Sequence, residues 1–236
     1  MTPRRPRHHP DSARSTRSGW LRAAVLGSDD AIVTTSSLMV GVAAANATTS
    51  AILISGVASV VAGAMSMAAG EYVSVSSQRD AEQADIDQEK AELANHPRAE
   101  LKELAGIYER RGLDPELARK VAAQLTARDG LGAHVRDELG IDGASRARPL
   151  QAAWASASSF ATFGLVPILA MLAAPAAWRI QTVAGVSLLA LAALGALGGH
   201  LGGAPRGRAA LRVTFGGGLA MAVTAAVGRL LGVSVG

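Results

Sequence analysis

The chain has 236 residues, of which 49% are hydrophobic, and it contains no cysteine. Without cysteine there are no disulfides or thiolate metal sites, which leaves carboxylate, imidazole and thioether groups as possible metal ligands. Only 3% of the residues are aromatic, so a stacking platform for nucleic-acid bases is not expected. The net charge of +4 comes from arginines in the N-terminal tail and in short connections, which is not the pattern of a nucleic-acid-binding domain.

Residues 1–18 are polar and rich in arginine and proline, and we expect this N-terminal tail to be disordered. The tail, the apolar run after it and Ala45-Asn46-Ala47 also resemble a secretory signal peptide with its cleavage site. Asp29 and Asp30 lie where the apolar part of such a peptide should begin. These two acids favour a retained membrane helix over a cleaved signal.

Long stretches without Asp, Glu, Lys, Arg or His dominate the rest of the chain. They cover residues 31–70, 149–178, 180–199 and 213–228. About 20 largely apolar residues are needed to cross about 30 Å of hydrocarbon. We therefore predict two transmembrane helices within residues 19–77, over about 19–45 and from about 50, and three more within residues 149–236, over about 152–173, 178–199 and 209–231.

Residues 78–148 hold fifteen of the nineteen carboxylates of the chain. Glu82, Asp85, Glu89 and Glu92 recur at helical spacing, so the second membrane helix is expected to continue to about Asn95. Three further helices are predicted. The first runs from Pro97 to about Arg111, the second starts at Asp114-Pro115-Glu116, and a short third one runs from about Leu131 to Leu139. The expected fold is all-α: five transmembrane helices, with an acidic three-helix metal-binding module between the second and the third.

Arginine-rich segments give the orientation, because they favour the cytosolic side of a membrane. With the N-terminal tail in the cytosol, the acidic module and the Arg206–Arg212 loop also fall in the cytosol, and five crossings leave the C-terminus outside.

Each of the two predicted N-terminal membrane helices carries a pair of residues that could contact a metal ion. Asp29 and Asp30 lie near mid-bilayer if the first helix starts at Gly19, where a charge costs roughly 2.5–3.5 kcal/mol and usually faces a pathway. A later start would put both acids at the interface. Met67 and Glu71 share a face of the second helix. The thioether suits a borderline metal such as Fe²⁺, although methionine is also an ordinary packing residue.

The acidic module contains three pairs of possible ligands at helical spacing. They are Glu89 and Glu92, Glu100 and Glu103, and His134 and Glu138. Pro97 lies between the first two pairs, so antiparallel helices would bring these carboxylates face to face. Such pairs with an imidazole resemble carboxylate metal sites in helical bundles. From spacing alone, a solvated acidic face explains them equally well.

Three motifs carry a resemblance to a known family. AVLGSDD at 24–30, VVAGAMSMAAGEY at 60–72 and DELG at 137–140 resemble the vacuolar iron transporter family. The resemblance covers nearly the whole chain after Gly19, and the second motif is highly specific. The Ala-, Gly- and Arg-rich composition suggests a bacterial-type member.

The resemblance implies a five-helix homodimer in the lipid bilayer that moves Fe²⁺, and often Mn²⁺, out of the cytosol, with proton antiport in the best understood members. The metals are cargo, and no prosthetic group is implied. The family's membrane aspartate falls on Asp30 and its membrane methionine on Met67. Its cytosolic glutamates fall on Glu89, Glu92, Glu100, Glu103 and Glu138.

The chain also departs from the family pattern. The glycine that usually follows the membrane aspartate is Ala31, and acids that plant members carry are Ala23 and Ser59. A pair of cytosolic methionines is replaced by His134 and Val135. The proton-coupling step and the choice between iron and manganese therefore stay open, and His134 is a candidate ligand in place of methionine.

The preferred interpretation is a metal exporter in which the acidic module captures the ion and passes it by Glu71 and Met67 to Asp30. It would lie in the plasma membrane of a bacterium, or in the vacuolar membrane of a eukaryote. The alternative is a membrane-anchored metal buffer or sensor without transport. No nucleophile–base pair and no phosphate-binding loop is recognisable, so an enzyme is not expected.

Overall fold

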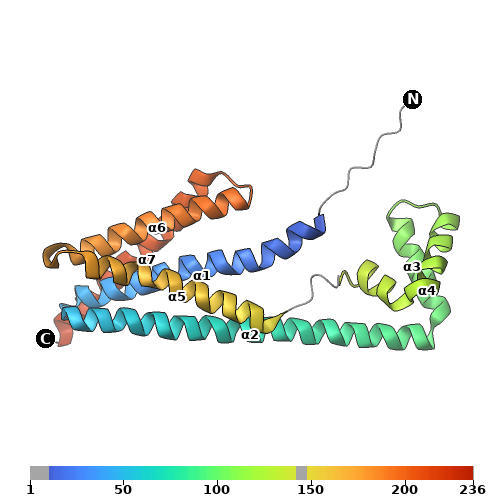
Figure 1. The fold of residues 1–236 in the computed structure, drawn as a ribbon, viewed down its shortest axis with the longest axis horizontal. Helices are drawn as coiled ribbons and strands as arrows, with labels where there is room; N and C mark the ends of the chain where they lie inside the picture. The colour runs from blue at the N-terminus through green and yellow to red at the C-terminus, as the bar shows by residue number, and fades with distance from the viewer. Residues whose placement is uncertain (1–10, 142–147, 236) are drawn as a thin grey trace, which may run out of the picture. The chain divides into compact units, whose positions relative to one another are not determined.

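A computed structural model describes residues 11–141 and 148–235, with side chains over 27–141 and 148–232. In this part of the chain every regular element is helical (Figure 1). The elements are α1 (Asp11–Ala44), α2 (Thr49–Asn95), α3 (Pro97–Arg110), α4 (Pro115–Asp137), α5 (Pro149–Ala173), the short 3₁₀ turn η1 (Ala176–Trp178), α6 (Arg179–Leu201) and α7 (Arg206–Val235).

The chain forms two compact units, each with its own core. The apolar unit comprises Arg17–Tyr72 and residues 150–235, and the acidic unit comprises Val73–Pro149 with residues 11–16. Helix α2 belongs to both, because its 47 residues run without interruption from the apolar segment into the charged one. This confirms the prediction that the second helix continues to about Asn95.

Four helices in the described part of the chain are long and apolar enough to cross a membrane. They are α2 (Thr49–Asn95), α5 (Pro149–Ala173), η1 with α6 (Ala176–Leu201) and α7 over Arg206–Gly232. Helix α1 is not among them, since Asp29 and Asp30 are followed by four hydroxyl residues that lower its hydropathy. The chain thus has the helices of a membrane protein, and the fifth crossing stays a prediction.

The core of the apolar unit joins helices that lie far apart in the sequence. It contains Met39, Val40, Ile52, Val60, Ile168, Ala170, Met171, Val183 and Met221. At Gly63 a Cβ atom would overlap the buried ring of Phe160, so only glycine lets α5 approach α2 this closely. Small residues serve this purpose in membrane helices, where packing holds the helices together. Leu169, Leu189 and Leu211 are instead exposed, as expected of side chains that contact lipid.

The acidic unit packs α3 against α4 around a small apolar core. The core consists of Leu104, Ala105, Ile107, Ala122 and Ala133. Helix α4 begins as predicted, because Asp114 accepts hydrogen bonds at 3.0 Å from the backbone N–H groups of Glu116 and Leu117, and Pro115 occupies the first helical position.

One helix boundary agrees with the predictions and one differs. The last short helix, expected to start near Leu131, begins after Asp129: the backbone of this residue leaves the helical region within α4, and its carboxylate accepts a bond from Gly132 N at 2.9 Å. Residues 11–18, expected to be disordered, form the first turns of α1. The reason is local: the last proline of the tail is Pro10, and the residues after it tolerate a helix. Residues 1–10 lie outside the described part.

Candidate metal centre

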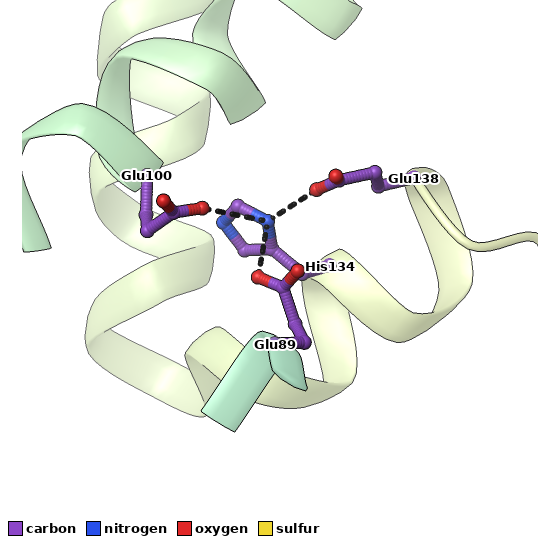
Figure 2. A group of neighbouring side chains, drawn as sticks. All are labelled: Glu89, Glu100, His134 and Glu138. Carbon is purple, nitrogen blue, oxygen red and sulfur yellow. Dashed lines mark hydrogen bonds and ion pairs between the residues drawn. The ribbon is translucent and has the colours of Figure 1, made fainter. Parts of the chain in front are cut away.

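Four side chains from three helices meet inside the acidic unit (Figure 2). Glu89 comes from the charged half of α2, Glu100 from the first turn of α3, and His134 and Glu138 from the end of α4. Each offers one ligand atom, and these atoms all lie within 4.8 Å of one another. The turn at His96 and Pro97 brings the first two helices together, and the kink at Asp129 precedes the turn that carries the last two residues.

The imidazole of His134 is the centre of this group. Its Nδ1 atom lies 2.7 Å from Glu138 Oε2, 3.0 Å from Glu89 Oε1 and 4.0 Å from Glu100 Oε2. The side chains of His134 and Glu89 are 0% and 2% exposed. Because one ring nitrogen carries at most one proton, His134 can hydrogen-bond only one of the three carboxylates through Nδ1 at a time.

Three atoms of the group are buried without a hydrogen-bond partner in the described part of the chain. These are Glu89 Oε1, Glu100 Oε2 and His134 Nε2. Burial raises the pKa of Glu89, and the carboxylate of Glu138 raises it further. Burial and the nearby Glu103 likewise raise the pKa of Glu100. Unsatisfied buried carboxylates are costly, and a divalent cation among them would remove both the desolvation cost and the repulsion.

The donor set also fits a metal ion chemically. Two atoms bound to one transition-metal ion through bonds of about 2.2 Å lie at most about 4.4 Å apart, close to the observed upper limit of 4.8 Å. Carboxylate oxygens suit Mn²⁺, and imidazole suits Fe²⁺ and other borderline ions. The arrangement can thus hold a first-row divalent ion after small side-chain movements.

Two predicted ligands of the acidic unit lie beside this group rather than in it. Glu92 is half-buried and accepts a hydrogen bond from Gln88 Nε2 at 3.0 Å, and Glu103 is exposed. Both carboxylates are near enough to raise the pKa of Glu100. Their roles as ligands stay predictions.

The predicted membrane residues are not gathered into a comparable group in the described part of the chain. Asp30 is exposed and accepts a hydrogen bond from Thr34 Oγ1 at 2.9 Å, while Met67 and Glu71 are half-buried on α2. A path through these three residues remains a prediction.

Asp29 was named beside Asp30 as a possible metal-contacting residue, but the predicted metal path used only Asp30. Its Oδ1 atom is buried and has no hydrogen-bond partner among the described residues, whereas Asp30 is exposed. The sequence could not distinguish the two, because adjacent residues of a helix both lie at nearly the same depth. The resemblance alone favoured Asp30.

A divalent ion is expected to stabilise the protein more at about pH 7.5 than at about pH 5. A carboxyl group whose pKa is raised by folding contributes stability below its unfolded pKa, and this contribution is lost as the pH rises through the folded pKa. Glu89 and Glu100 have raised pKa values, so the metal-free acidic unit becomes less stable as the pH rises above the usual glutamate value of 4.5. A bound cation reverses this loss, and saturation at about 100 times Kd adds about 2.7 kcal/mol.

Thermal unfolding of the detergent-purified chain, with and without Mn²⁺ at both pH values, measures this difference. The double variant Glu89→Gln with Glu100→Gln serves as the control and should show a smaller pH dependence, since only His134 and Glu138 then compete for protons. An Mn²⁺ effect of the same size at both pH values would contradict the role given to these two carboxylates.

Comparisons with known proteins agree over most of the chain. A model of the VIT family matches residues 21–229. A protein of Acanthamoeba castellanii named vacuolar iron transporter is 50% identical over 214 residues, which are 90% of this chain and 79% of that protein. Vacuolar iron transporter homolog 1 of Oryza sativa subsp. japonica is 38% identical over 216 residues, 92% of this chain and 75% of that protein. Vacuolar iron transporter homolog 2 of Arabidopsis thaliana is 37% identical over 219 residues, 92% of this chain and 87% of that protein.

Proposed function

The chain belongs to the VIT family, and from this premise we propose that it transports divalent metal ions out of the cytosol, with Fe²⁺ as the first candidate cargo and Mn²⁺ as the second. The observation that carries the proposal is the buried group of Glu89, Glu100, His134 and Glu138 in the acidic unit. The names of the relatives support iron as cargo.

In the proposed architecture α1 is a fifth membrane helix beside α2, α5, α6 and α7, and the chain acts as a homodimer in the bilayer. The N-terminus and the acidic unit face the cytosol, because arginine-rich segments favour that side. Capture of metal in the cytosol requires this orientation. Protease protection of sealed vesicles, with a tag at either terminus, tests it.

The proposed cycle starts at the acidic unit, whose carboxylates raise the local concentration of cations. The ion then passes Glu71 and Met67 on α2 and reaches Asp30 on α1. Protonation of Asp30 from the far side of the membrane would release the ion, so that the entry of protons into the cytosol drives the export of metal. A carboxylate is suited to this exchange because it binds either a proton or a metal ion.

Metal flux into proteoliposomes under an imposed pH gradient tests the proposal. Flux of Fe²⁺ or Mn²⁺ that depends on the gradient supports an antiporter and ranks the two ions. Flux without dependence on the gradient supports transport but contradicts proton antiport.

A membrane-anchored metal buffer or sensor is the second candidate. It is favoured by one observation: all four members of the ligand group lie within the acidic unit. Binding of metal without any flux in the same assay would establish this function instead.

A further inference from the structure

Asp137, in the last turn of α4, accepts hydrogen bonds from three side chains. Tyr108 Oη donates to Asp137 Oδ2 at 2.7 Å, and Arg111 Nη1 donates to Asp137 Oδ1 at 2.7 Å. Arg136 Nη2 donates to Oδ2 at 2.7 Å. The carboxylate is 10% exposed. Short charge-assisted bonds of this kind are stronger than neutral ones, so the side chain of residue 137 is held firmly.

Arg111 also binds the backbone of the same residue. Its Nη2 atom donates to the carbonyl oxygen of Asp137 at 3.0 Å, and its guanidinium lies 5.4 Å from the centre of the Tyr108 ring. The last carbonyl groups of a helix have no partner within the helix, and they are stabilised by donors from elsewhere. Tyr108 lies in α3, and Arg111 is the first residue after this helix. These bonds therefore tie the end of α3 to the end of α4.

The residues that follow Asp137 turn the chain sharply. Gly140 has a positive φ of 67°, and the N–H of Ile141 donates to the carbonyl of Val135 at 2.8 Å. Gly140 adopts this left-handed backbone readily because it has no Cβ, and it lies two residues after Glu138, the C-cap of α4. Glu138 therefore lies between a fixed residue on one side and a tight turn on the other.

Glu138 is the ligand that most needs such support. Its side chain is 25% exposed, against 2% for Glu89 and 8% for Glu100. Glu89 and Glu100 also have helix on both sides, whereas Glu138 caps α4 and has no further helical turn after it. Without the bonds to residue 137, the end of α4 would fray and the Glu138 carboxylate would leave the group.

We propose that Tyr108, Arg111 and Asp137 form a clamp that positions Glu138 as a metal ligand. None of the three is assigned a contact with the metal, so they are positioning residues. The inference rests on the proposed function, because it concerns the metal group through which the protein captures its cargo.

A double-mutant cycle on the full-length chain in detergent tests the clamp, with Mn²⁺ as the probe and free Mn²⁺ measured by electron paramagnetic resonance. Asp137→Asn is expected to raise the Kd for Mn²⁺ by ~10–100-fold, the usual cost of losing a supporting residue around a metal site. Glu138→Gln should raise it as well. The double variant should bind no more weakly than Glu138→Gln alone, because Asp137 acts through Glu138.

The matched control is Asp87→Asn, which removes the same charge from an exposed carboxylate of the same unit and should leave the Kd unchanged. Circular dichroism verifies the fold of each variant. If Asp137→Asn does not fold, Tyr108→Phe replaces it, since this change removes a single hydroxyl and keeps the ring beside Arg111.

The two possible failures are distinguishable. An unchanged Kd in Glu138→Gln overturns the metal group of the proposed function and the clamp with it. A raised Kd in Glu138→Gln, with either no effect of Asp137→Asn or effects that multiply fully in the double variant, overturns the clamp alone.

Discussion

Replacing Asp30 with asparagine is expected to reduce metal flux in proteoliposomes to the level of empty vesicles, while Mn²⁺ binding by the acidic unit stays unchanged. The amide keeps the size of the side chain and can still accept the hydrogen bond from Thr34. It cannot bind a proton in exchange for a metal ion, and it carries no charge to compensate a divalent cation in the membrane. In the proposed architecture Asp30 lies on a membrane helix, where an uncompensated charge is costly, so a carboxylate without a function there would be a liability.

Asp29→Asn is the matched control for this experiment, because it makes the same change one residue away. The structure sharpens the comparison, since Asp29 has a buried and unpartnered carboxylate oxygen while Asp30 is exposed. Unchanged flux in Asp30→Asn would contradict the proposed mechanism. If flux were lost only in Asp29→Asn, the membrane carboxylate of the transport path would be Asp29.

Helix ends with local chemical signals could be predicted from the sequence. Asp114 caps α4 with its own side chain and Pro115 fits the first turn, so neighbouring residues alone determine this boundary. Pro97 starts α3 for the same reason. The start of the last short helix near Leu131 was also predicted, and it follows the break at Asp129, whose carboxylate accepts a bond from the backbone N–H of Gly132.

The meeting of Glu89, Glu100, His134 and Glu138 was predicted only in part, because the sequence offered a larger set of candidate carboxylates. Spacing places Glu89 beside Glu92 and Glu100 beside Glu103 on their helices, and it cannot say which member of each pair faces inward. The packing of α3 against α4 decides this: Glu100 is buried next to His134, while Glu103 is exposed. Such a choice depends on the rotation of whole helices about their axes, which local sequence does not determine.

The prediction for His134 follows from its place at the centre of the group. Replacing His134 with glutamine is expected to weaken Fe²⁺ binding by ~10–100-fold or more, since losing a residue that only supports a metal site already costs this much. The same change should weaken Mn²⁺ binding less. Imidazole favours Fe²⁺ and other borderline ions, whereas carboxylates suffice for Mn²⁺. The variant leaves Glu89, Glu100 and Glu138 in place, so the preference for iron over manganese should fall. Anaerobic competition between the two ions, measured on the purified full-length chain, gives this ratio directly.

His96→Gln is the matched control, because this exposed histidine lies in the same unit and its side chain makes no capping bond. A second variant, His134→Met, places a thioether at the same position and should retain more of the preference for iron than glutamine does. Equal losses for both ions in His134→Gln would mean that the imidazole only organises the carboxylates. In that case the choice of metal would be made elsewhere, and Met67 on α2 would be the first residue to test.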